Sequence, residues 1–225
     1  MSAPARFWPR YAAWSLDAAL VAALLAPFFT GRVSRGLDSL QQSFVAVLDR
    51  FYGTLARQVD AGGAPDMFGL MSDASLRQAV EALQAALLHA IAAPVAAFAI
   101  VMLIWQVAGE RSRWQGSVGK RALRLRVVDR AGAQPAFVRS VGRQFAGLLS
   151  WATLNIGHAM AAIPPEHLAL HDRLSGTRVV RDAAPFPAWA RGWIVLQAGI
   201  FSALTFAMFG RLASLAQAAV ERALG

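Results

Sequence analysis

Three long apolar stretches alternate with polar segments along the chain. They cover residues 11–29, 85–108 and 192–209. Because an α-helix rises about 1.5 Å per residue and the hydrocarbon core of a bilayer is about 30 Å thick, about 20 apolar residues suffice for one crossing. The pattern therefore predicts three membrane-spanning helices.

The segment between the first two apolar stretches has a helical period of its own. Its large apolar residues recur every three or four positions among charged ones: Leu40, Phe44, Val47, Phe51 and Leu55. This spacing is typical of an amphipathic helix over residues 37–59 that is too polar to span. After a turn-rich stretch, Ser75 and Gln78 match a capping box, so a helix that leads into the second span is expected to begin near Ser75.

A fourth apolar stretch, residues 144–163, has two interpretations. It is long enough to span, but polar residues around Asn155 interrupt its middle. Residues 124–128 and 177–180, on either side of it, alternate as short β-strands do, and such strands can pair only on one side of the membrane. We therefore favour a re-entrant or interfacial hairpin over a full span.

The predicted fold class is an all-α polytopic membrane protein. It has three to four transmembrane helices, one of them the hairpin in the favoured interpretation, and a small cytoplasmic two-stranded patch. Pro9 just before the first span and Pro27 near its end fit the predicted ends of that helix.

Composition supports a membrane protein. The 225 residues are 56% hydrophobic and 16% charged, with a mean hydropathy of +0.43, which is unusual for a soluble domain. Lys and Arg outnumber Asp and Glu by 22 to 13. That excess also fits a nucleic-acid binder or a basic soluble domain, but the long uncharged stretches favour a membrane protein with basic loops. The chain has no cysteine, which excludes disulfides, thiolate catalysis and cysteine-ligated metals.

Charge also predicts the orientation in the membrane. Residues 110–143 are strongly basic, whereas residues 32–81 are nearly balanced. By the positive-inside rule the basic segment and the N-terminus lie in the cytoplasm and the balanced segment lies outside. A cleaved signal peptide is a weaker interpretation of the N-terminus, because Asp17 interrupts its apolar stretch and further spans follow.

The basic segment is expected to meet the bilayer rather than a nucleic acid. Few aromatic residues accompany its arginines, so no nucleic-acid partner is predicted. Near an anionic surface each basic residue contributes about 1 kcal/mol of attraction. The residues expected to contact anionic lipid headgroups are Lys120, Arg121, Arg124 and Arg126.

One carboxylate lies inside the first span. An ionised Asp17 at that depth costs about 2.5 to 3.5 kcal/mol, so a basic partner, protonation or a water-filled cavity must offset it. Arg10 lies two helical turns earlier on the same face, too far away for direct pairing. A partner from elsewhere in the chain is therefore expected, and His171 and Arg173, which flank Asp172, are candidates. The predicted strands also bring Lys120 and Arg121 within reach of the inner end of the first span.

Two strings point to a known family. G-K-R-A-L-R-L-R-V-V at residues 119–128 and L-H-D-R-L-S-G-T-R-V-V at residues 170–180, taken with Arg10 and Asp17, resemble the RDD family of bacterial membrane proteins. The family is named for one arginine and two aspartates. The resemblance implies that Arg10 is this arginine and Asp17 the first aspartate.

The resemblance has further implications for the site and the domains. It implies that Asp172 is the second aspartate, with Asp129 as the less favoured candidate. It also implies a multi-pass protein of the bacterial inner membrane, for which transport has been suggested. Residues 1–182 would form the family domain, with an extracytoplasmic insertion at residues 31–82. Residues 183–225 would form a C-terminal transmembrane helix and tail.

The expected site is a charge network inside the helix bundle, formed by Arg10, Asp17, His171, Asp172 and Arg173. An intramembrane carboxylate favours transport of a small solute or ion, with proton or sodium coupling. Because three or four spans are few for a transporter, a homo-oligomer or a complex with another membrane protein is expected. The alternative is a non-transporting membrane scaffold or assembly factor.

An enzyme is not expected. Neither a Ser-His-Asp set nor a pair of catalytic carboxylates can be assembled from the sequence, and no cofactor is predicted. His167 and His171 have the spacing of zinc ligands on one helix face, but Pro164 and Pro165 directly before them favour a loop. No metal site is therefore predicted.

Overall fold

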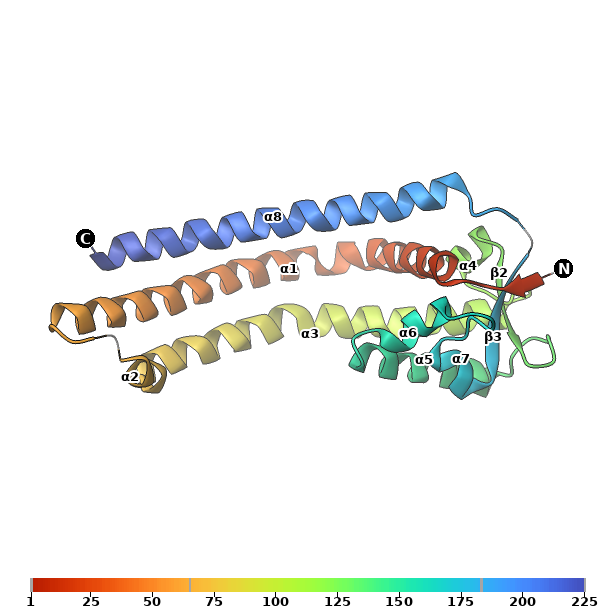
Figure 1. Ribbon diagram of the computed structural model, residues 1–225, viewed down its shortest axis with the longest axis horizontal. Coiled ribbons are helices and arrows are strands. Elements are labelled where there is room, and N and C mark those ends of the chain that lie inside the picture. The colour runs from red at the N-terminus through yellow and green to blue at the C-terminus, as the bar shows by residue number, and fades with distance from the viewer. Residues whose placement is uncertain (1, 65, 183, 225) are drawn as a thin grey trace. The chain divides into compact units, whose positions relative to one another are not determined.

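The chain is mostly helical and contains three long apolar helices. A computed structural model describes residues 2–64, 66–182 and 184–224. Helices α1 (Phe7–Asp60), α3 (Ala74–Arg111) and α8 (Ala188–Leu224) are each long and apolar enough to cross a membrane (Figure 1). This confirms the predicted fold class in its main feature.

The long helices extend well past the predicted spans. Helix α1 has 54 residues and joins the first span to the amphipathic segment 37–59, which we had expected to be a separate helix. Gly31 and Gly36 weaken a helix only slightly, and Pro27 lies inside α1 rather than at its end. Helix α8 likewise joins the third span to the predicted tail.

Helix α3 begins where the sequence predicts, but its cap is a different residue. Asp73 Oδ1 accepts hydrogen bonds from the backbone N–H groups of Ser75, at 2.8 Å, and Leu76, at 3.0 Å. A short carboxylate satisfies these first free N–H groups, as an N-cap does. Asp73, rather than Ser75 of the predicted capping box, therefore caps the helix.

The remaining elements are short. They are α2 (Met67–Ser72), α4 (Val118–Ala122), α5 (Phe137–Ala152), α6 (Ile156–Ala159), the 3-10 helix η1 (Met160–Ala162), α7 (Leu170–Ser175) and the strands β1 (Ser2–Pro4), β2 (Leu125–Asp129) and β3 (Thr177–Asp182).

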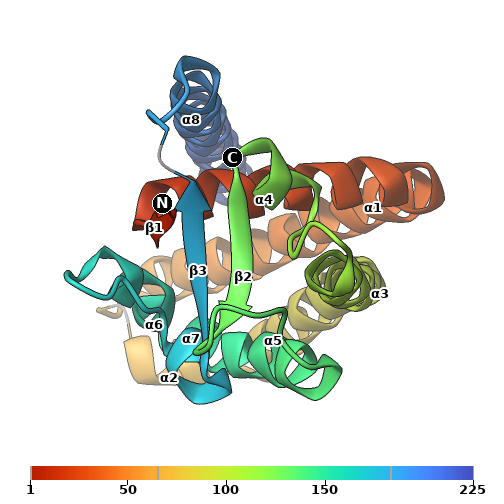
Figure 2. The same ribbon diagram turned by 90° about the vertical axis from the view of Figure 1, so that its right-hand side faces the viewer.

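A three-stranded antiparallel sheet lies next to these short helices. Figure 2 shows β3 between β1 and β2, and the register pairs Val127 with Val179 and Ala3 with Arg181. The predicted pairing of residues 124–128 with 177–180 is confirmed. The third strand, β1, was not predicted because three residues cannot show an alternating pattern.

The fourth apolar stretch forms a hairpin. Helix α5 has 16 residues and is not among the helices long and apolar enough to span. It ends at a turn in which Leu154 and Asn155 have positive φ angles of 52° and 65°, and α6 follows at once. The interruption predicted around Asn155 is thus the turn, and residues 144–163 do not form one continuous helix.

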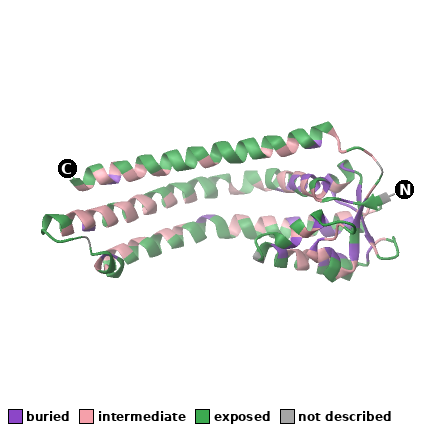
Figure 3. Cartoon of the chain, in the orientation of Figure 1, coloured by how far each residue is buried: buried purple, intermediate pink, exposed green. Residues whose placement is uncertain are grey.

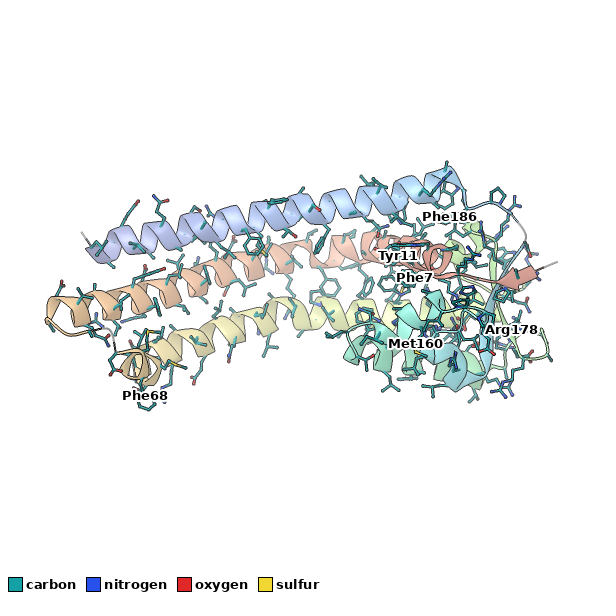
Figure 4. The ribbon with its side chains drawn as sticks, in the orientation of Figure 1. Phe7, Tyr11, Phe68, Met160, Arg178 and Phe186 are labelled. Carbon is teal, nitrogen blue, oxygen red and sulfur yellow. The ribbon has the colours of Figure 1, made fainter. Side chains whose placement is uncertain are left out.

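The chain forms two compact units. The sheet unit comprises Met1–Leu25 and Ala97–Gln197, and the helical unit comprises Ala26–Ala96 and Ala198–Gly225. Buried residues of the sheet unit gather around the sheet and the first turns of α1 (Figure 3). Leu123, Leu125 and Val179 form one core cluster there with Ala12 and Ala13. Phe7, Tyr11, Arg178 and Phe186, labelled in Figure 4, belong to this unit.

The helical unit is held by contacts between segments of the long helices. A Cβ atom on Gly36 of α1 would lie 2.6 Å from the Cβ atom of Ala90 of α3, so the two backbones approach closely there. On the other side of α1, Arg222 of α8 pairs with Asp49 at 2.7 Å. Phe68 on the short α2 is exposed (Figure 4).

Candidate functional site

Asp17 is fully buried in the sheet unit and accepts four hydrogen bonds. Trp105 Nε1 donates to its Oδ1 at 2.9 Å, and the Gly119 N–H donates to the same oxygen at 2.8 Å. Gln106 Nε2 donates to Oδ2 at 3.0 Å, and the Ser117 hydroxyl donates to Oδ2 as well. A buried carboxylate can be stabilised in this way, because each lone pair lost to water gains a protein donor.

The donors come from two elements that meet α1. Trp105 and Gln106 are neighbours on α3, while Ser117 and Gly119 lie at the start of α4. A Cβ atom on Gly119 would lie 2.1 Å from the Ala13 carbonyl oxygen, so only glycine allows its N–H to reach Asp17. Gly119, the first residue of the family-like string 119–128, thus contacts the first span.

Gln106 connects Asp17 to a second buried carboxylate. Its Oε1 accepts from Lys120 Nζ at 2.6 Å, and Lys120 Nζ also lies 3.0 Å from Glu110 Oε1. Glu110 is fully buried, and its Oε1 accepts from Gln144 Nε2 at 3.1 Å and faces Arg143 Nε at 3.3 Å. Among the described residues, Glu110 Oε2 has no hydrogen-bond partner.

Arg143 connects Glu110 to the third buried carboxylate, Asp172. Its guanidinium pairs with Asp172 Oδ1, while the guanidinium of Arg10 pairs with Asp172 Oδ2. Arg10 also donates to the backbone oxygens of Ala5, at 2.8 Å, and His167, at 2.7 Å. One continuous series of side chains therefore joins Asp17 to Arg10, and we call it the charge network: Asp17, Gln106, Lys120, Glu110, Arg143, Asp172 and Arg10.

The charge network is balanced, with three carboxylates and three basic groups. Burial alone would raise the pKa of Asp172, but the guanidinium groups of Arg143 and Arg10 hold the pKa of that carboxyl well below its usual range. Burial and the positive charge of Arg143 lower the pKa of His171 well below its usual value, so His171 is neutral. Its Nε2, 3.1 Å from Arg143 NH2, then accepts from the guanidinium.

The structure brings together some of the predicted site residues. Arg10 and His171 each contact Asp172, and Asp17 is linked to Asp172 only through other side chains. Arg173 is exposed and lies 3.6 Å from Glu166, outside the charge network. The alternative second aspartate, Asp129, instead accepts from backbone N–H groups of the turn that follows β2.

Sequence reasoning missed the centre of the network. Glu110 and Arg143 are 33 positions apart in the sequence, as their numbers show, and α5 must fold back for them to meet. One available signal was that Glu110 is the single acidic residue directly after the second apolar stretch. A lone acid beside so many arginines is a candidate for a buried pair.

The four residues expected to contact lipid headgroups have different surroundings. Lys120 belongs to the charge network, and its side chain is 12% exposed. Arg121 lies 3.8 Å over the ring of Trp114 and Arg126 pairs with Asp182 at 3.1 Å, while both arginines remain exposed. Arg124 is exposed on the turn before β2.

His167 and His171 do not face a common site. The His167 ring contacts the Ala161 carbonyl oxygen through Nδ1 at 3.0 Å, whereas His171 faces Arg143. Within the described part of the chain, no group of three His, Cys, Asp or Glu side chains is arranged to hold a metal ion.

Comparisons with known proteins identify the family of the chain. A profile of the RDD family matches residues 4–176, which include every member of the charge network. The chain is 41% identical over 69 residues to an uncharacterized protein, YxaI, from Bacillus subtilis (strain 168), and this match covers 31% of the present chain and 45% of YxaI. The chain thus spans less than half the length of that relative. No solved structure matches the chain. With three helices able to cross a membrane and the family profile covering most of its length, the chain belongs to the RDD family of membrane proteins.

Proposed function

We propose that the protein transports a small solute or ion across the bacterial inner membrane, coupled to protons or sodium through its buried carboxylates. The observation that carries this proposal is the environment of Glu110. Its Oε1 has three basic or amide partners, whereas its buried Oε2 has none among the described residues. A buried carboxylate oxygen without a donor is a position that a proton or a small cation can occupy.

The continuity of the charge network supports the same proposal. It runs from Asp17, inside the first apolar stretch, to Asp172 beside the basic sheet. A change of charge at Glu110 alters its electrostatic attraction for Lys120 and Arg143, because both contact its Oε1. Such coupling transmits ion binding to the helices that these residues connect. By the positive-inside rule, the basic three-stranded sheet lies on the cytoplasmic side in this proposal.

A second candidate function, a membrane scaffold or assembly factor, rests on Asp17. All four hydrogen bonds of this carboxylate come from groups of the same unit, and three acids match three bases in the network. A balanced buried network can have a purely structural role, which is to fix how α1, α3, α4 and α5 pack together. In that case the protein moves no ion.

Ion flux into liposomes that contain only this protein separates the two functions. Wild-type vesicles should carry sodium, potassium or protons faster than protein-free vesicles, and the rate should depend on a pH or sodium gradient. The Glu110→Gln variant should lose this flux. The Glu81→Gln variant is the matched control, because Glu81 lies on the same helix but is exposed. If wild-type vesicles are no more permeable than empty ones to any of these ions, ion transport by this protein alone is refuted and the scaffold is favoured.

A further inference from the structure

The helical unit contains a polar groove that is separate from the charge network. The groove has a volume of about 620 Å³ and lies between one face of α1 and one face of α3. Its polar lining consists of Arg32, Arg35, Ser39 and Ser43 from α1 and His89 from α3, and the rest is glycine and alanine. No acidic residue belongs to this lining.

The groove follows from the spacing of residues on the two helices. Arg32, Gly36, Ser39 and Ser43 recur at intervals of four, three and four, so they lie on one face of α1. The facing side of α3 carries mainly alanine, and Gly36 meets Ala90 where the two helices touch. Small residues leave space beside this contact, and the arginines and serines give the space polar walls.

The two arginines of the groove are not neutralised. Arg32 donates to the His89 carbonyl oxygen at 3.2 Å. The Arg35 side chain folds back along α1, so that its NH1 lies 3.6 Å from where a Cβ atom on Gly31 would be. Within the described residues, neither guanidinium has a carboxylate within 4.0 Å, whereas Arg222 of the same unit is paired with Asp49. Two free guanidinium groups over one groove attract an anion.

The position along α1 indicates which anions are available. Arg32 and Arg35 directly follow the apolar stretch 11–29, at the level where a spanning helix leaves the hydrocarbon core. Basic side chains at such a position reach the headgroup region, and phosphate is the anion present there. Guanidinium groups bind phosphate oxygens in pairs, and serine hydroxyls can donate to the oxygens that remain.

We propose that this groove binds a phosphate group through Arg32 and Arg35, with Ser39 and Ser43 as additional donors. The phosphate can belong to an anionic lipid headgroup or to a soluble phosphate. Both sources present the same phosphate group to the groove, and competition between lipid and inorganic phosphate distinguishes them. This site is independent of the proposed transport, because it shares no residue with the charge network.

The test uses the full-length protein purified in a neutral detergent. Native mass spectrometry measures the affinity for phosphatidylglycerol, and calorimetry measures binding of inorganic phosphate. The groove variant is Arg32→Gln/Arg35→Gln. The matched control is Arg50→Gln/Arg77→Gln, which removes the same charge from exposed residues of the same unit outside the groove. A third variant, Ser39→Trp, fills the groove without changing its charge.

The groove variant should bind phosphatidylglycerol about tenfold more weakly or worse, and Ser39→Trp should also weaken binding, while the control should match wild type. If inorganic phosphate binds alone and displaces the lipid, the groove holds a soluble phosphate. If inorganic phosphate neither binds alone nor displaces the lipid, the groove holds a lipid headgroup. Equal losses in the groove and control variants would show nonspecific attraction to positive charge and overturn the proposal. Absence of binding by wild type in both assays would also overturn it.

Discussion

Asp17 is stabilised by neutral donors that surround it, and among the residues that the structure describes no basic group contacts it directly. Its two oxygens accept from an indole, an amide, a hydroxyl and a backbone N–H. The nearest basic group along the network is Lys120, which reaches Asp17 only through Gln106. Because each donor is itself held by α3 or α4, the carboxylate acts as a point at which three helices are fixed together.

The Asp17→Asn variant should therefore be less stable than wild type. An amide has one acceptor oxygen, and its NH₂ group would face donors that now point at Asp17. Ser117 can rotate its hydroxyl to accept, but Gln106 can do so only by turning its own oxygen away from Lys120. One buried donor left without an acceptor lowers the free energy of unfolding by about 1–3 kcal/mol. The unfolding temperature in detergent should fall, and the exposed control Asp38→Asn should leave it unchanged. Equal stability of both variants would contradict the buried site.

The neutral state of His171 predicts how stability depends on pH. Burial and Arg143 hold its folded-state pKa well below the unfolded value of about 6.5. Below pH 6.5 the unfolded chain therefore binds more protons than the folded chain, so stability falls as the pH falls from 7 to 5. His158, whose pKa burial also lowers, contributes with the same sign.

The His171→Gln variant should reduce this dependence. A glutamine oxygen can accept from Arg143 but does not titrate in this range. Unfolding temperatures measured at pH 7 and pH 5 should differ less for the variant than for wild type. A variant with the same pH dependence as wild type would show that His171 is not held neutral by this contact.

The residues of the network differ in how readily the sequence reveals them. Arg10, Asp17 and Asp172 stand out because charges are rare near apolar stretches or because they belong to a family motif. Trp105, Gln106 and Ser117 do not stand out, because tryptophan, glutamine and serine are ordinary at the end of a spanning helix. Their roles depend on which turn of α3 lies beside Asp17, and that register is a tertiary property.

At the scale of elements, α5 is apolar outside and polar inside. Ser140, Arg143 and Ser150 are buried on its inner face, whereas Phe145 and Leu148 are more than half exposed. The turn that follows carries Leu154, which is 89% exposed. This arrangement is the reverse of a soluble amphipathic helix, and it fits a helix whose outer face lies against lipid.

A fluorescent label at Leu148 should therefore lie in lipid. Because the chain has no cysteine, Leu148→Cys can be labelled specifically with an environment-sensitive dye. In liposomes, spin-labelled lipid chains should quench this dye strongly. The same dye on Arg126→Cys, an exposed position of the sheet, should be quenched weakly. Equal quenching at both positions would place α5 outside the bilayer.

Element types were easier to predict than element ends. The 3.6-residue and two-residue periods identified the long helices and both paired strands correctly. The end of the first helix, predicted near Pro27, was wrong, because α1 continues through Pro27 and Gly31. A glycine or proline raises the free energy of the helix only around its own position. Packing contacts, such as that of Gly36 with Ala90 in the helical unit, offset this cost.

At the scale of the whole molecule, the fold predicts a membrane topology. If α1, α3 and α8 each cross once and α5 does not cross, the sheet and α2 lie on opposite sides. Single cysteines at Arg178 and Ser72, both exposed, should react with impermeant reagent from opposite sides of sealed membrane vesicles that contain the protein. A cysteine at Leu154 should not react from the side that reaches Ser72. If it does, the α5–α6 hairpin crosses the membrane.

The central claim is that the charge network carries ions as well as holding the fold. Asp17→Asn cannot test it, because losing Asp17 disrupts the packing of three helices. Glu110→Gln is more selective, since the glutamine oxygen can still accept from Lys120 and Arg143, and its NH₂ group can occupy the place of the unpartnered Oε2.

The most direct test measures flux and unfolding temperature on the same preparations of wild type, Glu110→Gln and Glu81→Gln. The account predicts that Glu110→Gln loses about nine-tenths of the flux or more, a decrease of about tenfold, which corresponds to about 1.4 kcal/mol. The variant should remain folded and incorporate into liposomes as wild type does. Glu81→Gln should match wild type in both measurements. Wild-type flux with undiminished flux in Glu110→Gln would contradict the account, because the network would then be structural only.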